Sequence, residues 1–397
     1  MAVFEHYQQR GGNTHPFART DRSPLGVWWW TTDRLLLGVV VTLIGLGLML
    51  SFAASPGAAA RLHHHTSPFY FAERQCLFGA LGVGMVVAVS VLSPRGVRRL
   101  SVVVYLVSVL AMLALPLIGH AAKGGDRWLS FGGFSLQPSE FMKPALIVLA
   151  GWMFSESPKG QGVPGVFIAF LLYALPAFLL IRQPDFGQTL LVTCAFGAAF
   201  FVAGVPMLWM AGMTASAGVV FTLMLLTHGH SQRRLQTFFN ADGQTGRQVD
   251  RAAEAIRHGA LFGVGPGEGV FKRGVPEAHT DFIYSVAAEE YGLLFCIALI
   301  GLFALLVIRG LYRAMKLEDA YEQVAAAGLF VLVGLQVLIN IAVNLNIIPT
   351  KGMTLPFISY GGSSMLAMGL TMGMALALTR RRPRPLAPGF TTTRAQP

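Results

Sequence analysis

Long apolar segments alternate with short polar connections along most of the chain. Segments long enough to enter or cross a bilayer cover about residues 34–54, 74–92, 99–118, 139–155, 164–181, 187–204, 207–227, 282–308, 324–343 and 364–379. Apolar runs of about 20 residues with few charges are typical of transmembrane helices. The pattern therefore predicts an all-α, polytopic membrane protein of about ten transmembrane helices, with a large polar loop at 228–281 between the seventh and the eighth.

The distribution of positive charge indicates how these spans are oriented. Cytoplasmic connections of membrane proteins are enriched in Lys and Arg, and the short connections 93–98, 156–163 and 309–323 carry such residues. An even number of spans places both termini on this cytoplasmic side. We therefore divide the chain into a cytoplasmic segment 1–32, a transmembrane domain 33–379 whose 228–281 loop is extracytoplasmic, and a basic cytoplasmic tail 380–397.

The composition supports a membrane protein and argues against several other classes. Only 12% of the 397 residues are charged and 54% are hydrophobic, whereas soluble domains carry roughly 25% charged residues. The formal net charge of +11 is concentrated beside apolar spans, which fits cytoplasmic loops better than nucleic-acid binding. The sequence contains no Walker loop, dinucleotide fingerprint or Ser–His–Asp pattern, so ATP-driven and nicotinamide chemistry are disfavoured.

The large loop contains one further periodic pattern. In "RQVDRAAEAIRHGALFG", apolar residues recur at helical spacing, which predicts a short amphipathic helix on the membrane surface or on the helix bundle. The sequence "GVGPGEG" follows. It lacks the preceding strand and following helix of a phosphate-binding loop, so a flexible turn is favoured over a phosphate cradle.

A first polar stretch, "KGGDRWLSFGGFSLQPSEFMK" at 123–143, lies on the predicted outer face. Gln137, Glu140 and Lys143 are spaced by three, so they share one face of a helix. Glu140 and Lys143 either neutralise each other where the helix enters lipid, or form a polar floor that receives phosphate or sugar hydroxyls. The nearby Arg127 favours a ligand, because Arg and Lys are the usual phosphate contacts.

Two other polar stretches are candidate sites. The role of the first stays open, and the second is disfavoured. In "RQPDFGQT", residues 182–189, Arg182 and Asp185 either pair with each other across the turn or face a ligand. The three histidines at 63–65 suggest a metal, but adjacent side chains do not readily face one ion and no carboxylate motif follows. A specific metal site there is disfavoured.

Irregular backbone and polar side chains are expected together before the last span. "NIIPTKGMTLPFISYGGSS" contains prolines and glycines that prevent a regular helix. Irregular backbone at this depth requires burial in protein or a wet cavity. On the preceding span, Gln336, Asn340 and Asn344 recur every fourth residue. Hydrogen bonds between helices explain this polar stripe without any substrate.

The stretch "VPEAHTDFIYSVAAEEYGLL", residues 275–294, concentrates acidic side chains at a membrane span, where carboxylates are costly. Glu277 and Asp281 belong to the end of the outer loop, within reach of water. Glu289 and Glu290 lie two turns into the helix, where we expect one of them to pair or to be protonated within the bundle, and we interpret both as structural groups. Asp281 lies at the head of the helix, where the N-terminal dipole favours an ionised carboxylate.

Four of these stretches resemble the signatures of the SEDS family of peptidoglycan glycosyltransferases, which includes FtsW, RodA and SpoVE. They are "GGDRWLSFGGFSLQPSEFMKP", "RQPDFGQTLL", "VPEAHTDFIYSVAAEEYGLL" and "IPTKGMTLPFISYGGSS". The resemblance runs in order from about residue 33 to 379. "FSLQPSEFMKP" and "GVPEAHTDFI" are most similar to the cell-division (FtsW) branch. Gly125-Asp126 departs from the alanine–arginine pair common in relatives, so Arg127 must suffice for the phosphate contact at this place.

The resemblance implies an enzyme that polymerises lipid II into glycan strands during septal cell-wall synthesis. Asp281 matches the family's proposed general base, and Arg127 and Lys143 match positions near the pyrophosphate. The other substrate-binding residues implied by the match are Gln137, Glu140, Asp185, Glu277, His279, Lys351 and Ser359. The donor sugar is already carried on a polyprenyl pyrophosphate, so no nucleotide is needed, and a divalent cation, Mg²⁺ or Mn²⁺, stays open as a cofactor.

The resemblance also implies partners and a location. It predicts a class B penicillin-binding protein (an FtsI-like transpeptidase) and other division proteins as partners, and a place in the bacterial inner membrane at the division septum. Three alternatives remain: a lipid II flippase, an elongation polymerase of the RodA type, and a scaffold without catalysis. The polar groups cluster on the outer face rather than along a path through the membrane, which favours the polymerase over the flippase.

Overall fold

The computed structural model describes residues 23–61, 67–118, 120–122, 125–131, 134–157, 164–206, 218, 244–275, 277–349 and 352–381. The predicted seventh span, 207–227, lies outside the described residues apart from Gly218, and so do the histidines at 63–65 and Lys351. Each of the other predicted spans is a helix, which confirms the helical membrane fold as far as the description reaches.

The helices follow the sequence pattern closely. They are α1 (Pro24–Thr31), α2 (Arg34–Ala59), α3 (Tyr70–Ser90), α4 (Pro94–Ile118), α5 (Pro138–Glu156), α6 (Gly165–Arg182), α7 (Phe186–Val202), α10 (Gln244–Gly259), the 3₁₀ turn η3 (Phe271–Gly274), α11 (Ile283–Ala314), α12 (Ala320–Asn344) and α13 (Gly362–Thr379). Within the described residues, 7 of these helices are long and apolar enough to cross a membrane. Two further helices in predicted spans are not among these 7: α5, which carries the charged Glu140 and Lys143, and α7, which has only 17 residues.

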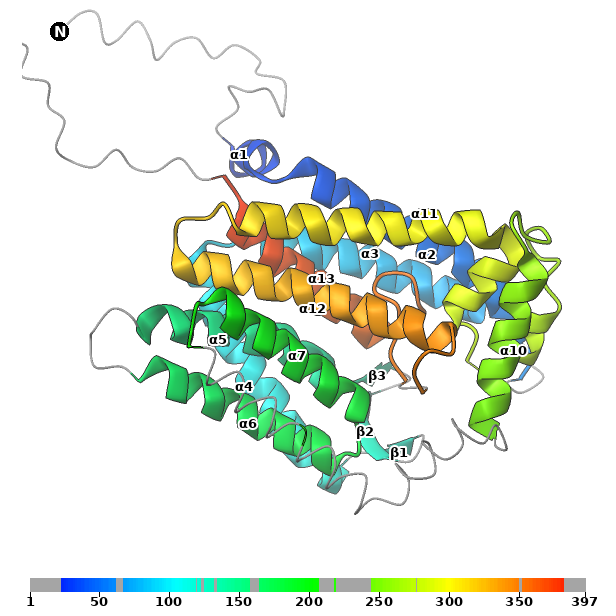
Figure 1. Cartoon of the computed structure of the whole chain (residues 1–397), viewed down its shortest axis with the longest axis horizontal. Coiled ribbons are helices and arrows are strands. Elements are labelled where there is room, and N and C mark those ends of the chain that lie inside the picture. Colours follow the sequence, from blue (N-terminus) through cyan, green and yellow to red (C-terminus); the bar gives the residue numbers. More distant parts are fainter. Residues whose placement is uncertain are drawn as a thin grey trace, which may run out of the picture.

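The bundle is built around α12. This helix packs against α5, α7, α11 and α13, and most of its residues are buried. α13 packs on α3 and is buried along nearly its whole length. By contrast, Val107 and Leu110 on α4 are 61% and 64% exposed, as expected for a face that contacts lipid. Figure 1 places α10, the three short strands and the connection between α12 and α13 toward the same end of the bundle.

The connection between α4 and α5 contains strands that the sequence analysis treated only as a loop. β1 (His120–Ala122), β2 (Gly125–Phe131) and β3 (Phe134–Leu136) pair in an antiparallel sheet in that order. The sheet carries Arg127 into position above the turn between α6 and α7.

The opposite end of the bundle is tied together by a buried carboxylate. Asp33 caps α2 by accepting from the backbone N–H of Leu36, and it forms ion pairs with Arg309 (2.9 Å) and Arg313 (3.1 Å) from α11. Burial alone raises the pKa of Asp33, but the hydrogen bonds and the charges of both arginines outweigh it and hold the pKa below its usual range.

These contacts predict that acid loosens this end of the bundle. A carboxyl whose pKa is lowered by folding stabilises the protein above its unfolded pKa of about 4, and this contribution disappears as pH falls through the folded pKa. We therefore expect the melting temperature of the wild-type chain to fall between pH 6 and pH 3 more than that of Asp33→Asn. Parallel acid profiles for the two proteins would contradict the assignment.

Candidate active site

Asp281 lies at the start of α11, directly before its N-cap residue Phe282. Its backbone carbonyl accepts hydrogen bonds from the side-chain amides of Asn340 and Asn344, each at 3.0 Å. Its side chain is partly exposed, and its Oδ2 lies 3.8 Å from the point that a Cβ would occupy on Gly352. The carbonyl is therefore tied to α12, while the carboxylate faces the segment between α12 and α13.

That segment is irregular and is held in place by the polar stripe of α12. Gln336 Nε2 donates to the carbonyl of Thr354 (3.1 Å), and Asn340 Nδ2 donates to that of Met353 (2.7 Å). The stripe therefore forms hydrogen bonds inside the bundle as predicted. Its partners, however, are largely backbone carbonyls, those of Thr354 and Met353 in the irregular segment and that of Asp281, because backbone without regular structure leaves these groups in need of donors.

The segment also packs closely against α2. A Cβ added to Gly47 would lie 2.4 Å from the carbonyl oxygen of Phe357 and 2.8 Å from the Cα of Ile358. These contacts involve backbone atoms, which cannot move aside as a flexible side chain can. Gly47 therefore sets how near the irregular segment lies to α2.

Gly47→Ala is expected to lower the free energy of unfolding by about 1–3 kcal/mol, as overpacking does elsewhere. Gly45→Ala is the matched control on the same helix, because nothing lies within 4 Å of its added Cβ. Its expected effect is neutral or a stabilisation of up to about 1 kcal/mol from helix propensity. Thermal unfolding of both variants in detergent distinguishes them, and equal melting temperatures would contradict the close approach.

Two other predicted site residues near Asp281, His279 and Glu277, form contacts within the protein. The backbone carbonyl of His279 accepts from the N–H of Tyr360 (2.9 Å), and its ring lies 4.3 Å from that of Phe71. Glu277 has a positive φ of 60°, and its carbonyl accepts from the N–H of Thr280 at 3.0 Å. The outer loop therefore reaches Asp281 through a turn that is fixed to the α12–α13 segment.

Ser359 is buried rather than open to a ligand. Its side chain is folded into the segment, where its Oγ accepts from the N–H of Leu355 at 2.8 Å. Its carbonyl accepts from Gln75 Nε2 at 3.2 Å, which joins the segment to α3. These contacts stabilise the turn that follows Gly352.

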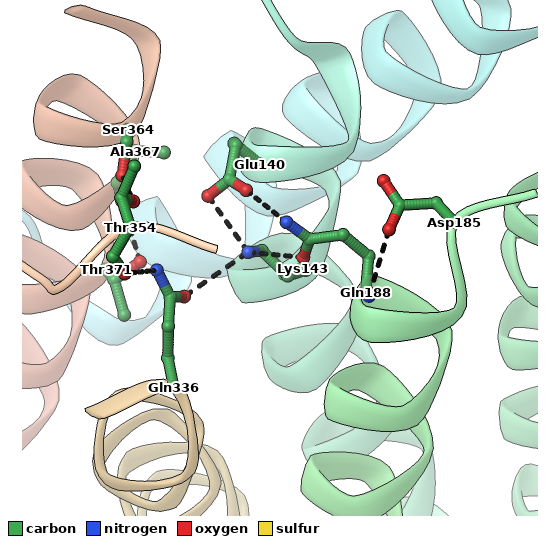
Figure 2. A network of polar contacts seen from close by, with 9 residues as sticks. All are labelled: Glu140, Lys143, Asp185, Gln188, Gln336, Thr354, Ser364, Ala367 and Thr371. Carbon is green, nitrogen blue, oxygen red and sulfur yellow. Dashed lines mark hydrogen bonds and ion pairs between the residues drawn. The ribbon is translucent and has the colours of Figure 1, made fainter. Parts of the chain in front are cut away.

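A second group of polar residues centres on Lys143, as Figure 2 shows. Lys143 Nζ contacts Glu140 Oε2 (2.9 Å), Gln188 Oε1 (2.8 Å) and Gln336 Oε1 (3.3 Å). Gln188 Nε2 in turn donates to Glu140 Oε1 at 2.6 Å. The Lys143 side chain is 0% exposed. The network therefore joins α5, α7 and α12 in the interior.

The pair of Glu140 and Lys143 expected from their spacing is confirmed, but its surroundings differ from both interpretations. The pair is enclosed by protein instead of lying at the entry into lipid, and amide side chains supply its remaining hydrogen bonds. Gln137, the N-cap residue of α5, is also buried. Gln188 was not singled out in the sequence, although it lies one turn after Asp185 in the same motif.

Arg127 binds the turn between α6 and α7. Its Nε donates to the carbonyl of Gln183 and its Nη2 to that of Pro184, both at 2.8 Å, and its Nη1 lies 3.4 Å from Asp185 Oδ2. Asp185 therefore pairs with Arg127 from another segment and not with Arg182, which is exposed. The physical reason is that β2 brings a guanidinium against the turn and satisfies carbonyls and carboxylate together.

The Asp185 side chain makes two contacts at the turn between α6 and α7. It caps α7 by accepting from the backbone N–H of Gln188 at 3.3 Å, and it pairs with Arg127. Burial raises the pKa of its carboxyl, although Arg127 and the Gln188 N–H act in the opposite direction. Together the two contacts connect the partly exposed guanidinium of Arg127 to the interior network around Lys143.

Gln336 connects the residues around Asp281 with the group centred on Lys143. Its Oε1 accepts from Lys143, and its Nε2 donates to the carbonyl of Thr354, next to the residue held by Asn340. Asp281, the irregular segment and the interior network are thus one hydrogen-bonded assembly at one end of the bundle. This end also carries a partly exposed carboxylate and a guanidinium, which together suit a reaction that needs a base and a cation.

Comparison with known sequences gives consistent matches over nearly the whole chain. Residues 33–383 match the family model FTSW_RODA_SPOVE, described as a cell cycle protein. The probable peptidoglycan glycosyltransferase FtsW of Caulobacter vibrioides is 64% identical over 372 residues, covering 93% of this chain and 95% of that protein. The corresponding protein of Trichlorobacter lovleyi is 35% identical, covering 87% and 93%.

Solved structures with the same fold agree with these matches. A chain of a peptidoglycan synthase complex that coordinates polymerization and crosslinking has a TM-score of 0.72 and 26% identity, covering 88% of this chain and 98% of that one. The rod shape determining protein RodA of Thermus thermophilus has a TM-score of 0.65 and 25% identity, covering 88% and 97%.

Proposed function

Because this chain belongs to the family of the cell cycle proteins FtsW, RodA and SpoVE, we propose that it is a peptidoglycan glycosyltransferase that polymerises lipid II. It is a multi-pass membrane protein. The observation that carries the assignment of its site is the placement of Asp281, whose backbone is fixed by two asparagines and whose carboxylate faces a Gly352-containing segment. Related FtsW proteins carry the name of the same activity.

The proposed reaction joins two lipid-linked sugars. The hydroxyl oxygen of the acceptor forms a bond to the anomeric carbon of the donor, and the bond from that carbon to the polyprenyl pyrophosphate breaks. Asp281 accepts the proton of the attacking hydroxyl as general base. Arg127, which keeps 15% of its side chain exposed, lies at the rim and stabilises the departing pyrophosphate.

Lys143 acts from inside the bundle in this proposal. Its ammonium is enclosed with Glu140, Gln188 and Gln336, so it holds together the helices that carry the rim. The described residues contain no group of three or more His, Cys, Asp and Glu side chains arranged for a metal ion.

The proposed setting is the division septum, with the site on the extracytoplasmic face and both termini in the cytoplasm. The similarity to FtsW proteins supports the division role. The structural neighbour from a synthase complex supports a crosslinking partner, for which we propose a class B penicillin-binding protein together with other division proteins. A tagged full-length chain is expected to collect at midcell, and an even distribution around the cell would contradict the division role.

Polymerisation by the purified protein tests the function directly. The full-length chain is reconstituted in liposomes with labelled lipid II, alone and with its transpeptidase partner, and glycan strands are resolved on a gel. We expect strands whose yield rises when the partner is present. Movement of lipid II between the leaflets without any strands, even with the partner bound, would instead establish a flippase.

A further inference from the structure

α11 is interrupted near its start. Gly292 has φ 81° and ψ 177°, which divides the helix into a short part, residues 283–291, and a long part that ends at Ala314. The short part carries Asp281 at its head. The outer loop fills the interruption with main-chain hydrogen bonds: Val264 N to Glu289 O (2.9 Å), Gly265 N to Glu290 O (3.1 Å), Leu293 N to Ala260 O (3.0 Å) and Leu294 N to Leu261 O (3.2 Å).

Backbone approaches backbone at this junction, and glycines make the approach possible. A Cβ on Gly263 would lie 2.2 Å from the carbonyl oxygen of Glu290, and one on Gly292 would lie 2.4 Å from the nitrogen of Gly263. Both glycines also have positive φ, 82° and 81°, which other residues adopt only with strain. Any larger residue at position 263 or 292 would clash with the facing backbone, so this arrangement of the junction requires both glycines.

Two buried carboxylates strengthen the junction. Glu289 accepts from the N–H groups of Phe271 and Lys272, both at 2.8 Å, and Glu290 accepts from the N–H of Gly267 at 3.1 Å and pairs with Lys272 Nζ. The glutamates are 0% and 1% exposed. Buried carboxylates are strongly destabilising unless hydrogen-bonded and paired. Here the outer loop supplies these partners: its "GVGPGEG" turn binds Glu290 through Gly267, and the residues just after the turn bind Glu289.

The same stretch of loop is fastened to α2. Lys272 Nζ donates to the carbonyl of Ala53 at 3.0 Å, and Arg61 Nη1 donates to that of Val275 at 2.9 Å. We call residues 259–275 the clasp. It joins α2 to the short part of α11, so that the short part is held at both of its ends: by the clasp at one and by the asparagines of α12 at the other.

We propose that Glu289 and Glu290 are positioning residues for Asp281, because they bind the clasp to the short part of α11. The clasp thereby sets where the Asp281 carboxylate lies relative to segment 352–361. The catalytic consequence rests on the proposed function, whereas the mechanical coupling rests on the contacts alone. A displacement of about 1 Å at a reacting group can lower a rate about 100-fold, so a loosened clasp slows catalysis without touching the substrate.

Glu289→Gln is the substitution that addresses the clasp. The amide retains the shape and one acceptor, but it directs an NH₂ group at one of the two N–H donors, so one hydrogen bond is replaced by a repulsive contact. Glu254→Gln is the matched control, because Glu254 is exposed on α10 in the same loop. It removes the same charge and leaves the clasp intact.

Amide hydrogen exchange of the full-length chain in nanodiscs measures the coupling. For Glu289→Gln we expect exchange to rise about tenfold or more at the amides of residues 264–272 and, together with them, at residues 283–291, because units that open together exchange together. The Glu254→Gln protein is expected to match the wild type. An opened clasp with wild-type protection of residues 283–291 would overturn the proposal.

A disulfide between the clasp and α2 separates the role of this attachment from that of the contacts between the clasp and α11. A Cβ on Gly57 would lie 3.6 Å from the Cα and 3.7 Å from the Cγ of Arg273, which suits the Cβ–Cβ separation of about 3.5–4.5 Å in disulfides. Gly57→Cys with Arg273→Cys therefore staples the clasp to α2. The exposed Cys76 and Cys194 are first replaced by alanine.

Polymerisation kinetics of the stapled and unstapled proteins decide the outcome. We expect Glu289→Gln to lower kcat about tenfold or more with KM for lipid II changed less than about twofold, since a misplaced base affects the chemical step. The oxidised staple holds the clasp on α2 but supplies no bond to α11, so kcat of Glu289→Gln is expected to stay low with and without dithiothreitol. Unchanged kcat in Glu289→Gln, or its full restoration by the staple, would overturn the positioning role of the contacts between the clasp and α11. If the wild type makes no strands, the proposed function fails, while hydrogen exchange still decides the coupling.

Discussion

Asp281→Asn is expected to lower the rate of lipid II polymerisation by about 100- to 10,000-fold, the range that general-base catalysis contributes. Asparagine has nearly the same size as aspartate but does not accept a proton from the attacking hydroxyl. The hydrogen bonds from Asn340 and Asn344 go to the backbone carbonyl of residue 281. They therefore persist in the variant, and so does the fold around it.

The measurement is the initial rate of glycan-strand formation by the purified variant with its partner, beside its melting temperature. We expect the rate to collapse while the melting temperature changes little. Asp250→Asn is the matched control, because Asp250 is an exposed acid on α10 of the same outer loop, and it should polymerise at the wild-type rate. Full activity of Asp281→Asn would remove Asp281 from the reaction and favour a scaffold.

Lys143→Met is expected to destabilise the protein by about 3–5 kcal/mol, which is typical when one member of a buried ion pair is removed. The substitution leaves the Glu140 carboxylate in the interior with a hydrogen bond from the Gln188 amide but without the ammonium that pairs with it. It also frees Gln188 Oε1 and Gln336 Oε1 from their shared donor. The network that joins three helices then has a buried charge without a counterion.

Thermal unfolding of the variant, monitored by helical circular dichroism in detergent, measures this loss. Adding Glu140→Gln to Lys143→Met is expected to recover a large part of the stability, because the double variant no longer buries a charge. Lys316→Met is the control: Lys316 is exposed after α11, and its loss should stay within about 0.5 kcal/mol. A double variant less stable than Lys143→Met would contradict the paired network.

Much of the fold could be predicted because hydrophobicity alone places most membrane helices. The spans outside 207–227, the amphipathic helix α10 and the polar stripe of α12 all follow from periodicity, which is a local property of the sequence. One of Glu289 and Glu290 was expected to pair or to be protonated, because a carboxylate two turns into a span is costly otherwise. The structure confirms each of these expectations within the described residues.

The remaining features depend on contacts between distant parts of the chain. Gly292 lies in "AEEYGLLF", which is typical of a continuous helix, and only residues 260–265 of the preceding loop account for its positive φ. Likewise, Asp185 pairs with Arg127 rather than Arg182 because a short sheet that the pattern did not predict brings Arg127 there. The roles expected for the site residues in binding substrate stay predictions.

The clasp binds the short part of α11 largely through main-chain groups. Its inward and outward surfaces are therefore constrained differently. Its inward surface is fixed by glycines and N–H donors, while Phe262 and Val270 turn outward and are 78% and 63% exposed. Side chains on the outward surface can therefore be exchanged without altering the hydrogen bonds beneath them. The loop can acquire new external contacts by substitution while the geometry around Asp281 stays the same.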